Sequence, residues 1–171
     1  MKTRQGMMIV AAGCLLSTAA WCASSADTSF AKKAAQGGMA EVAMGKLAES
    51  HGQSADVKAF GAKMVQDHST ANDQLKVAAE QEHIQLPTSP SSKQQATLNH
   101  LSKLNGEAFD KAYGQTMVKD HKKDISEFKQ EIQHGTSSPI QTFAKTTLPT
   151  LQEHLSMAEK LPGAASTPNG Q

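Results

Sequence analysis

The chain has 171 residues, with 17 basic and 16 acidic side chains and 38% hydrophobic residues. This length suits one domain with a substantial core and is short for two. The charges nearly balance, and the closest approach to a basic cluster, Lys119, Lys122 and Lys123, is typical of a solvated helix face. Nucleic acid and anionic membrane surfaces are therefore not expected as partners.

Residues 1–26 are predicted to be a secretory signal peptide. Lys2 and Arg4 precede an apolar run over 7–21, and small residues follow. The run of about 15 residues is shorter than the roughly 20 that a membrane-spanning helix needs. Cleavage after Cys22 or after Ala26 fits the small-residue rule, and the second is slightly favoured. The mature protein is expected to be periplasmic or secreted, without a transmembrane segment.

Both cysteines, Cys14 and Cys22, lie in the signal segment. A mature chain cut after Ala26 therefore has neither a disulfide nor a thiolate metal site, and carries 15 basic against 16 acidic side chains. The sequence around Cys14, Ala-Ala-Gly-Cys, loosely resembles a lipoprotein processing site. A lipid-anchored outer-membrane form is therefore the less favoured alternative.

Apolar residues spaced three and four apart predict a series of helices with no convincing strand. Gly52 and Ser54 mark a helix end and the next helix start, and Leu86-Pro87 begins a break. Pro149 is expected to kink the last helix or to split off its first turn. The predicted helices span 28–50, 55–83, 92–104, 107–133 and 140–160.

Four long amphipathic helices with one short connecting helix predict an all-α four-helix bundle over residues 27–161. The connecting segment of about 23 residues, which contains the short helix, is long enough to carry the chain along the bundle, as in ferritin-like crossovers. A simple up-down order stays open. Residues 162–171 are small and polar and are expected to be a disordered tail.

One pentapeptide occurs twice, as Met-Val-Gln-Asp-His over 64–68 and as Met-Val-Lys-Asp-His over 117–121. Residues four apart lie on one face of a helix, and in both copies that face is the apolar one. The sequence therefore places an imidazole in a hydrophobic stripe twice.

Each long helix has one ionisable side chain in or beside its apolar stripe: Glu41, His68, His121 and His154. A buried carboxylate or imidazole without a partner is costly, so mutual pairing or a shared metal is expected. Three imidazoles and a carboxylate suit iron, manganese, zinc or copper. The alternative is that these histidines are hydrogen-bonded core residues.

Three aspartates lie close to this set: Asp67, Asp120 and Asp124. They are candidates for additional ligands or for acceptors that orient the imidazoles, although a solvated or capping role is the commoner one. Met64, Met117 and Met157 lie one helical turn from the histidines, which favours Cu(I) if the thioethers participate. Methionine at this spacing more often fills a core.

Two Glu-x-x-His strings, at Glu80–His83 and Glu131–His134, match the spacing of di-iron bundles. Both fall off the predicted apolar stripes at helix C-termini, where the dipole favours histidine. They are interpreted as surface features. No phosphate-binding loop or Ser/Cys nucleophile arrangement is visible.

Together these features resemble a bacterial ferritin-like family known as domain of unknown function 4142, whose members are often labelled predicted outer-membrane proteins. The matching features are Phe30, Gly-Met-Ala-Glu-Val around Glu41, the first pentapeptide, Phe-Asp-x-x-Tyr at 109–113, His121, and Leu-Pro at 148–149 before His154. The resemblance implies an exported, ferritin-like four-helix bundle over about 30–161. It implies no reaction, and the chain lacks both the alternating strands of a membrane barrel and the di-iron pattern of ferritins in its proper places.

The sequence therefore predicts an exported helical bundle of uncharacterised role that binds a transition metal, iron or copper among others, through Glu41, His68, His121 and His154. The alternative is a non-enzymatic envelope-stress or interaction module with structural histidines. Enzymatic activity is disfavoured, and a homo-oligomer stays open.

Overall fold

The computed structural model describes residues 23–164, so the predicted signal up to residue 22 and the tail beyond residue 164 lie outside the described part. Within it the chain forms five helices and no strand, which confirms the predicted all-α class. None of these helices combines the length and apolar character that crossing a bilayer requires. The helices are α1 (Ser25–His51), α2 (Ala55–Gln81), α3 (Ser92–Leu101), α4 (Gly106–His134) and α5 (Ser138–Ala158).

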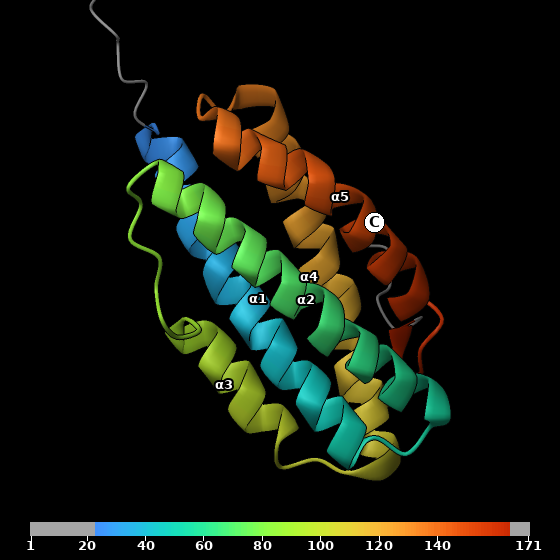
Figure 1. Ribbon diagram of the computed structural model, residues 1–171. Helices are drawn as coiled ribbons and strands as arrows, with labels where there is room; N and C mark the ends of the chain where they lie inside the picture. Colours follow the sequence, from blue (N-terminus) through green and yellow to red (C-terminus); the bar gives the residue numbers. More distant parts are fainter. Residues whose placement is uncertain (1–22, 165–171) are drawn as a thin grey trace, which may run out of the picture.

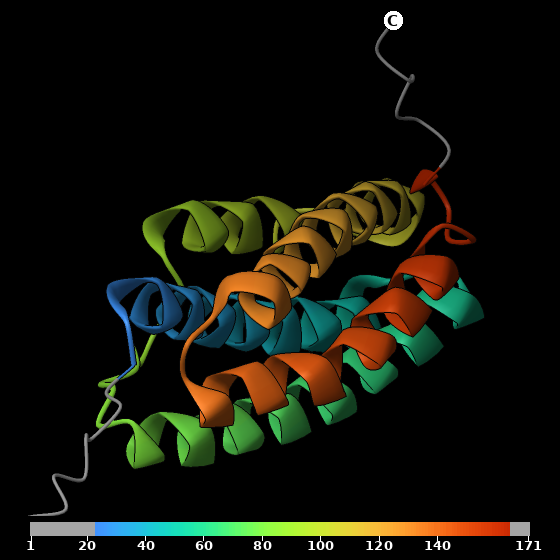
Figure 2. The same cartoon turned by 90° about the horizontal axis from the view of Figure 1, so that it is seen from above.

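The four long helices form a bundle in which α1 packs mainly on α2, and α4 on α5, while α2–α5 and α1–α4 contacts close the ring. Helix α2 ends at one end of the bundle and α4 begins at the other (Figure 1). The segment between them runs back along the outside, and α3 lies beside α1 and α4 (Figures 1 and 2). This is the crossover order rather than the simple up-down one.

Serine side chains begin four of the five helices. Ser24, Ser54, Ser91 and Ser137 each accept a backbone N–H from the first turn that follows. Helix α1 begins three residues earlier than expected because Ser24 and Asp27 form a reciprocal capping box. Signal cleavage after Ala26 would remove Ser24 from this cap, whereas cleavage after Cys22 would leave it in place. Helix α5 continues through Pro149 without the expected split.

The apolar core has two clusters that lie at opposite ends of the bundle. One contains Met64 of α2 and Met117 of α4, and the other contains Leu75 of α2 and Ile125 of α4. In each of these helices the candidate histidine falls between the two clusters. The core therefore leaves one level of the bundle to polar side chains.

Helices α1 and α2 approach closely at Gly45 and Gly61. A Cβ atom on Gly61 would lie 2.7 Å from the Gly45 carbonyl oxygen and 2.7 Å from the Cβ of Ala48. Only glycine fits that contact without a shift of backbone. It locks the register of α1 against α2, and thereby the level of Glu41 relative to His68.

Buried aspartates tie the two ends of the bundle. Asp110 of α4 accepts the backbone N–H groups of Gln53 and Ser54 at 2.9 and 2.8 Å. At the other end Asp27 of α1 accepts the backbone N–H and the hydroxyl of Thr136 at 2.9 and 2.7 Å. Burial by itself would raise the pKa of Asp27, but the hydrogen bonds from Thr136 and Ser24 outweigh it and hold that pKa below its usual range.

The first residues of the predicted tail, 162–164, differ from expectation. Leu161 is buried, and the Pro162 carbonyl lies so close to Gly114 of α4 that a side chain there would collide with it. The described part of the predicted tail, 162–164, therefore packs on α4 instead of leaving it.

The Glu-x-x-His strings are surface features with one exception. Glu80, His83 and His134 are exposed as predicted, but Glu131 is only 5% exposed. It turns toward the end contact made by Asp27. Burial, and then the neighbouring Asp27 carboxylate, raise the pKa of Glu131 to about 7. The surface assignment of Glu131 was wrong because the helix packs closely on α1 up to its last turn.

This raised pKa predicts a pH-dependent stability. Between about pH 4.5 and pH 7 folded Glu131 holds a proton that the unfolded chain has released, so stability falls as pH rises through this window. One pKa unit corresponds to about 1.4 kcal/mol, so the shift from 4.5 to about 7 bounds the total loss at about 3.5 kcal/mol. Glu131→Gln cannot titrate and should be more stable than wild type at pH 8 but similar at pH 4.5, in urea unfolding at both values. If the stability difference between Glu131→Gln and wild type is the same at pH 8 as at pH 4.5, the prediction is wrong.

Candidate metal centre

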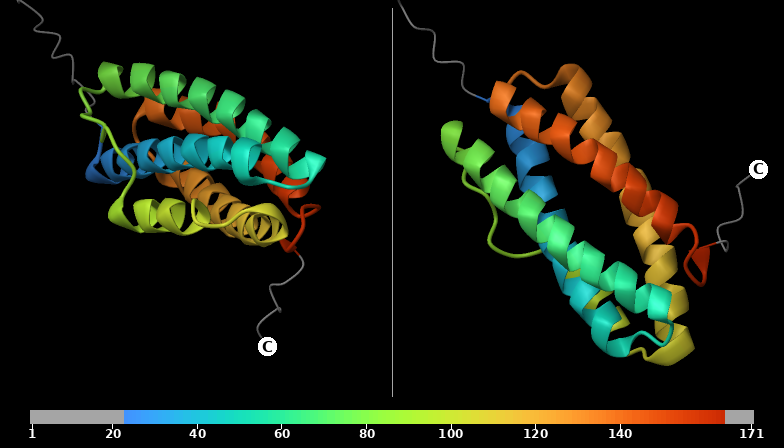
Figure 3. Two further views of the ribbon diagram at one scale, coloured as in Figure 1. Left: turned by 90° about the horizontal axis from the view of Figure 1, so that it is seen from below. Right: turned by 45° about the vertical axis from the view of Figure 1, so that its right-hand side comes forward.

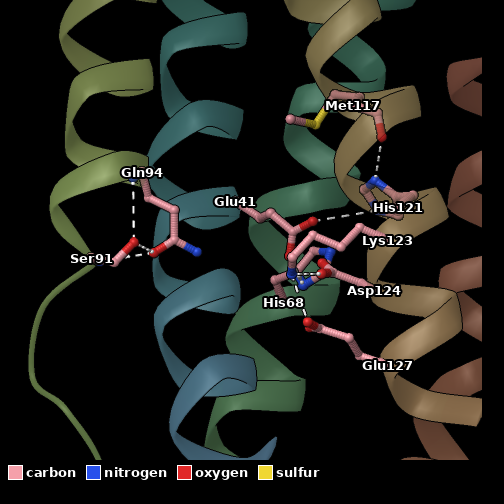
Figure 4. Close-up of polar contacts among 9 residues, drawn as sticks. All are labelled: Glu41, His68, Ser91, Gln94, Met117, His121, Lys123, Asp124 and Glu127. Atoms are coloured by element: carbon pink, nitrogen blue, oxygen red, sulfur yellow. Dashed lines mark hydrogen bonds and ion pairs between the residues drawn. The ribbon is translucent and has the colours of Figure 1, made fainter. Parts of the chain in front are cut away.

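The four side chains predicted from the sequence meet at the polar level of the bundle. Glu41 comes from α1, His68 from α2, His121 from α4 and His154 from α5, and all four are buried. The three imidazole ring centres lie 5.2 to 5.8 Å apart. Figure 4 shows the Glu41 carboxyl group reaching toward His68 and His121. The structure therefore brings all four together.

Each imidazole has one nitrogen held by a hydrogen-bonding partner. His121 donates from Nδ1 to the carbonyl oxygen of Met117, one turn earlier in α4, at 2.8 Å. Nε2 of His154 lies 2.8 Å from Oδ2 of Asp67. Nδ1 of His68 lies 3.0 Å from Oε2 of Glu41. Such contacts fix the orientation of a ring and determine which nitrogen is left to bind something else.

The opposite nitrogens have no hydrogen-bond partner among the described residues: Nε2 of His68, Nε2 of His121 and Nδ1 of His154. The second carboxylate oxygen of Glu41, Oε1, is likewise without a hydrogen bond and lies 3.7 Å from Nε2 of His121. Four buried polar atoms from four helices are thus unsatisfied at one level. Buried polar groups in proteins are normally hydrogen-bonded, so four unpartnered polar atoms at one level need an explanation.

The spacing of the imidazoles suits a single metal ion. One ring nitrogen from each of the three histidines lies within 4.8 Å of the others. A tetrahedral zinc site with metal–nitrogen bonds of about 2.0–2.1 Å places its nitrogens roughly 3.4 Å apart. Small rotations of the three side chains would close that gap. The three histidines can therefore hold a metal ion.

Electrostatics keep these imidazoles neutral at neutral pH. Burial, followed by the neighbouring histidines, lowers the pKa of His68. Burial lowers the pKa of His121 to about 4, and it lowers that of His154 against the opposing effect of Asp67. Neutral imidazole is the form that binds metals. Burial, then Asp124 and Asp120, raise the pKa of Glu41.

The three candidate aspartates are placed differently. Asp67 contacts His154 directly and also pairs with Lys63 at 3.1 Å, the geometry of an acceptor that orients a ligand. Asp124 instead pairs with Lys123 at 3.1 Å. Asp120 and Asp124 both line a cavity beside the site, and within residues 23–164 neither hydrogen-bonds to an imidazole.

The methionines of the repeat lie in the core. Met64 and Met117 are completely buried in the apolar cluster next to the histidines, and Met157 packs at its edge. This is the gap-filling role.

Thr147 of α5 is a polar residue near the site that the sequence analysis did not identify. Its buried hydroxyl has no partner in the described structure, and it lines a cavity of about 20 Å³ together with Glu41 and His68. Its position seven residues before His154, two helical turns away on the same face, was the available signal.

The chain was compared with known families and structures. The model of the family described as "Domain of unknown function (DUF4142)" matches residues 15–161. No curated protein matches the chain. Among solved structures it is similar to a crystal structure of a DUF305 fragment from Deinococcus radiodurans, with a TM-score of 0.70 and 12% identity over 81% of this chain and 95% of that one. At this identity the likeness shows a shared helical fold alone. The family match over most of the length shows that the chain belongs to the DUF4142 family, as its motifs predicted.

Proposed function

We propose that this protein is an exported binding protein for a transition-metal ion. His68, His121 and His154 are the ligands, and Glu41 both orients His68 and offers its free oxygen as a fourth ligand. Asp67 orients His154 and the Met117 carbonyl orients His121. The observation that carries the proposal is the set of three buried imidazoles, each hydrogen-bonded on one nitrogen and unpartnered on the other.

Energetics favour a ligand over a purely structural role. A buried polar atom without a hydrogen bond costs about 1–3 kcal/mol. The contacts with Glu41 and Asp67 satisfy one nitrogen each of His68 and His154, but the other nitrogen of each of the three rings has no partner among the described residues. One ring nitrogen of each histidine lies within 4.8 Å of one from each of the other two, so a single cation can engage all three rings. Three imidazoles with an adjacent carboxylate oxygen suit zinc, copper or iron.

Metal binding to purified protein tests this function. The protein should bind about one Co²⁺ or Zn²⁺ per chain, measured by Co²⁺ absorption and by elemental analysis after dialysis. His68→Ala/His121→Ala should weaken binding at least about 100-fold, because two of the three ligands are gone. The matched control is His100→Ala/His134→Ala, which removes two exposed histidines and should bind as wild type does.

The outcomes separate the two interpretations of the histidines. Stoichiometric metal in wild type with loss in the site double variant supports the proposal. Wild type without metal at any tested concentration overturns it. In that case a double variant that loses only stability would favour the interaction module with structural histidines.

Export is part of the proposal and rests on the signal peptide predicted over residues 1–26. The N-terminal residue of protein recovered from the periplasm or medium tests it. A mature chain beginning after Cys22 or after Ala26 supports export, and an intact N-terminus in the cytoplasm overturns it.

A further inference from the structure

A cavity of about 300 Å³ lies between α1, α3 and α4, beside the histidines. Its walls run from exposed side chains such as Lys93 to the buried carboxyl of Glu41, which is 3% exposed. Glu41 therefore closes the inner end of the cavity, and its unpartnered oxygen belongs to the same carboxyl group that contacts His68.

This cavity adjoins the small cavity of about 20 Å³ that is lined by His68. The two share four lining residues: Lys33, Glu41, Asp124 and Glu127. The inner one is also lined by His68 and by Thr147, whose hydroxyl has no partner in the described structure. Polar groups thus line both cavities, from the exposed Lys93 to the buried His68.

The groups that line the outer cavity include several that can bind a cation. Four carboxyl groups line the outer cavity, from Glu41, Asp120, Asp124 and Glu127, against three ammonium groups, from Lys33, Lys93 and Lys123. Lys123 is already engaged, because its ammonium group lies 3.1 Å from Asp124 and 2.8 Å from Glu127 (Figure 4). The ammonium group of Lys123, a cation, is therefore already held by both carboxylates in the cavity wall.

We propose that the cavity between α1, α3 and α4 is the entry route by which a divalent cation reaches the three histidines. Asp124 and Glu127 are the first groups to bind the incoming ion, which displaces the Lys123 ammonium group from between them. Glu41 then passes the ion inward to the imidazoles. This inference rests on the proposed function, since it concerns how the same site is filled.

The opposite side of the site is closed by an ion-pair chain. Lys63 joins Asp67 at 3.1 Å and Glu153 at 3.3 Å, and Asp67 covers His154. Figure 3 shows α2 and α5 side by side along this face. An ion entering there would have to break the contact that orients His154.

The rate of metal uptake tests the route, with Co²⁺ alone as the probe and stopped-flow absorption as the readout. Glu127→Gln should slow uptake about tenfold, because it removes one of the two capturing carboxylates. Lys123→Gln should accelerate it by a similar factor. Gly37→Leu should slow uptake by filling the cavity, because a Cβ at Gly37 would point at Gln94 and Asp124 from 3.8 and 3.9 Å.

A route changes entry and exit together, so the equilibrium Co²⁺ affinity of these variants should stay within about threefold of wild type. Gly37→Ala, whose added Cβ makes only ordinary contacts, is the folding control for the leucine variant. The matched charge controls are Lys122→Gln and Glu159→Gln, which remove an exposed ion pair outside the cavity and should leave the rate unchanged.

Failure of this inference is distinguishable from failure of the proposed function. Stoichiometric Co²⁺ binding with wild-type uptake rates in Glu127→Gln, Lys123→Gln and Gly37→Leu overturns the route and leaves the metal site intact. Faster uptake in Lys63→Gln, with no effect of the cavity variants, would place the entrance on the α2–α5 side. Absence of Co²⁺ binding in wild type overturns both.

Discussion

Saturating zinc should raise the melting temperature of the wild-type protein by roughly 10–15 °C. An ion that binds only the folded state at about 1,000 times its dissociation constant stabilises that state by about 4 kcal/mol. For a domain of this size each kcal/mol shifts the midpoint by about 2–4 °C. The added stability comes from metal–nitrogen bonds to His68, His121 and His154, each of which has one buried nitrogen without a hydrogen-bond partner.

His121→Leu should abolish this shift. The variant removes a completely buried ligand and replaces it with an apolar side chain of similar volume. Without zinc it should be at least as stable as wild type, because a buried nitrogen without a partner has been removed. Differential scanning calorimetry with and without zinc measures both effects, and His100→Ala is the control. A zinc shift of wild-type size in His121→Leu would contradict the ligand assignment.

The free energy of unfolding should fall by about 3 kcal/mol in Asp110→Ala. Asp110 is buried, and its two oxygens accept the backbone N–H groups of Gln53 and Ser54 in the turn between α1 and α2. Hydrogen bonds to a charged group contribute about 1.5–3 kcal/mol each, and the alanine leaves both donors without their acceptor.

Asp110→Asn should lie between wild type and alanine, because its amide retains one acceptor oxygen and turns its NH₂ group toward a donor. Asp56→Ala, an exposed acidic residue in the first turn of α2, should cost less than about 1 kcal/mol and serves as the control. Urea unfolding measures all three. A loss below about 0.5 kcal/mol for Asp110→Ala would show that the turn holds without this contact.

Asp110 has a role that the sequence does not indicate. It belongs to the Phe-Asp-x-x-Tyr motif, but nothing near it in the chain predicts that it caps a turn more than 50 residues away. Its role depends on α4 beginning at the same end of the bundle where α1 passes into α2. The residues that neighbour Asp110 in the sequence therefore cannot predict this contact.

The helices, the bundle class and the inward faces of Glu41, His68, His121 and His154 were determined by the sequence alone. They depend on apolar spacing and on capping residues, which act over one or two helical turns. The repeated Met-Val-x-Asp-His string is enough by itself to place two of the histidines on apolar helix faces.

Only the tertiary structure decided that the four side chains share one level, that Asp67 rather than Asp120 or Asp124 holds an imidazole, and that Glu131 is buried. These depend on the axial register between helices, which close packing at Gly45 and Gly61 and the end contacts of Asp27 and Asp110 set. Periodicity defines the face of a helix but not its height against a neighbour. The candidate metal site therefore exists only once the bundle has formed.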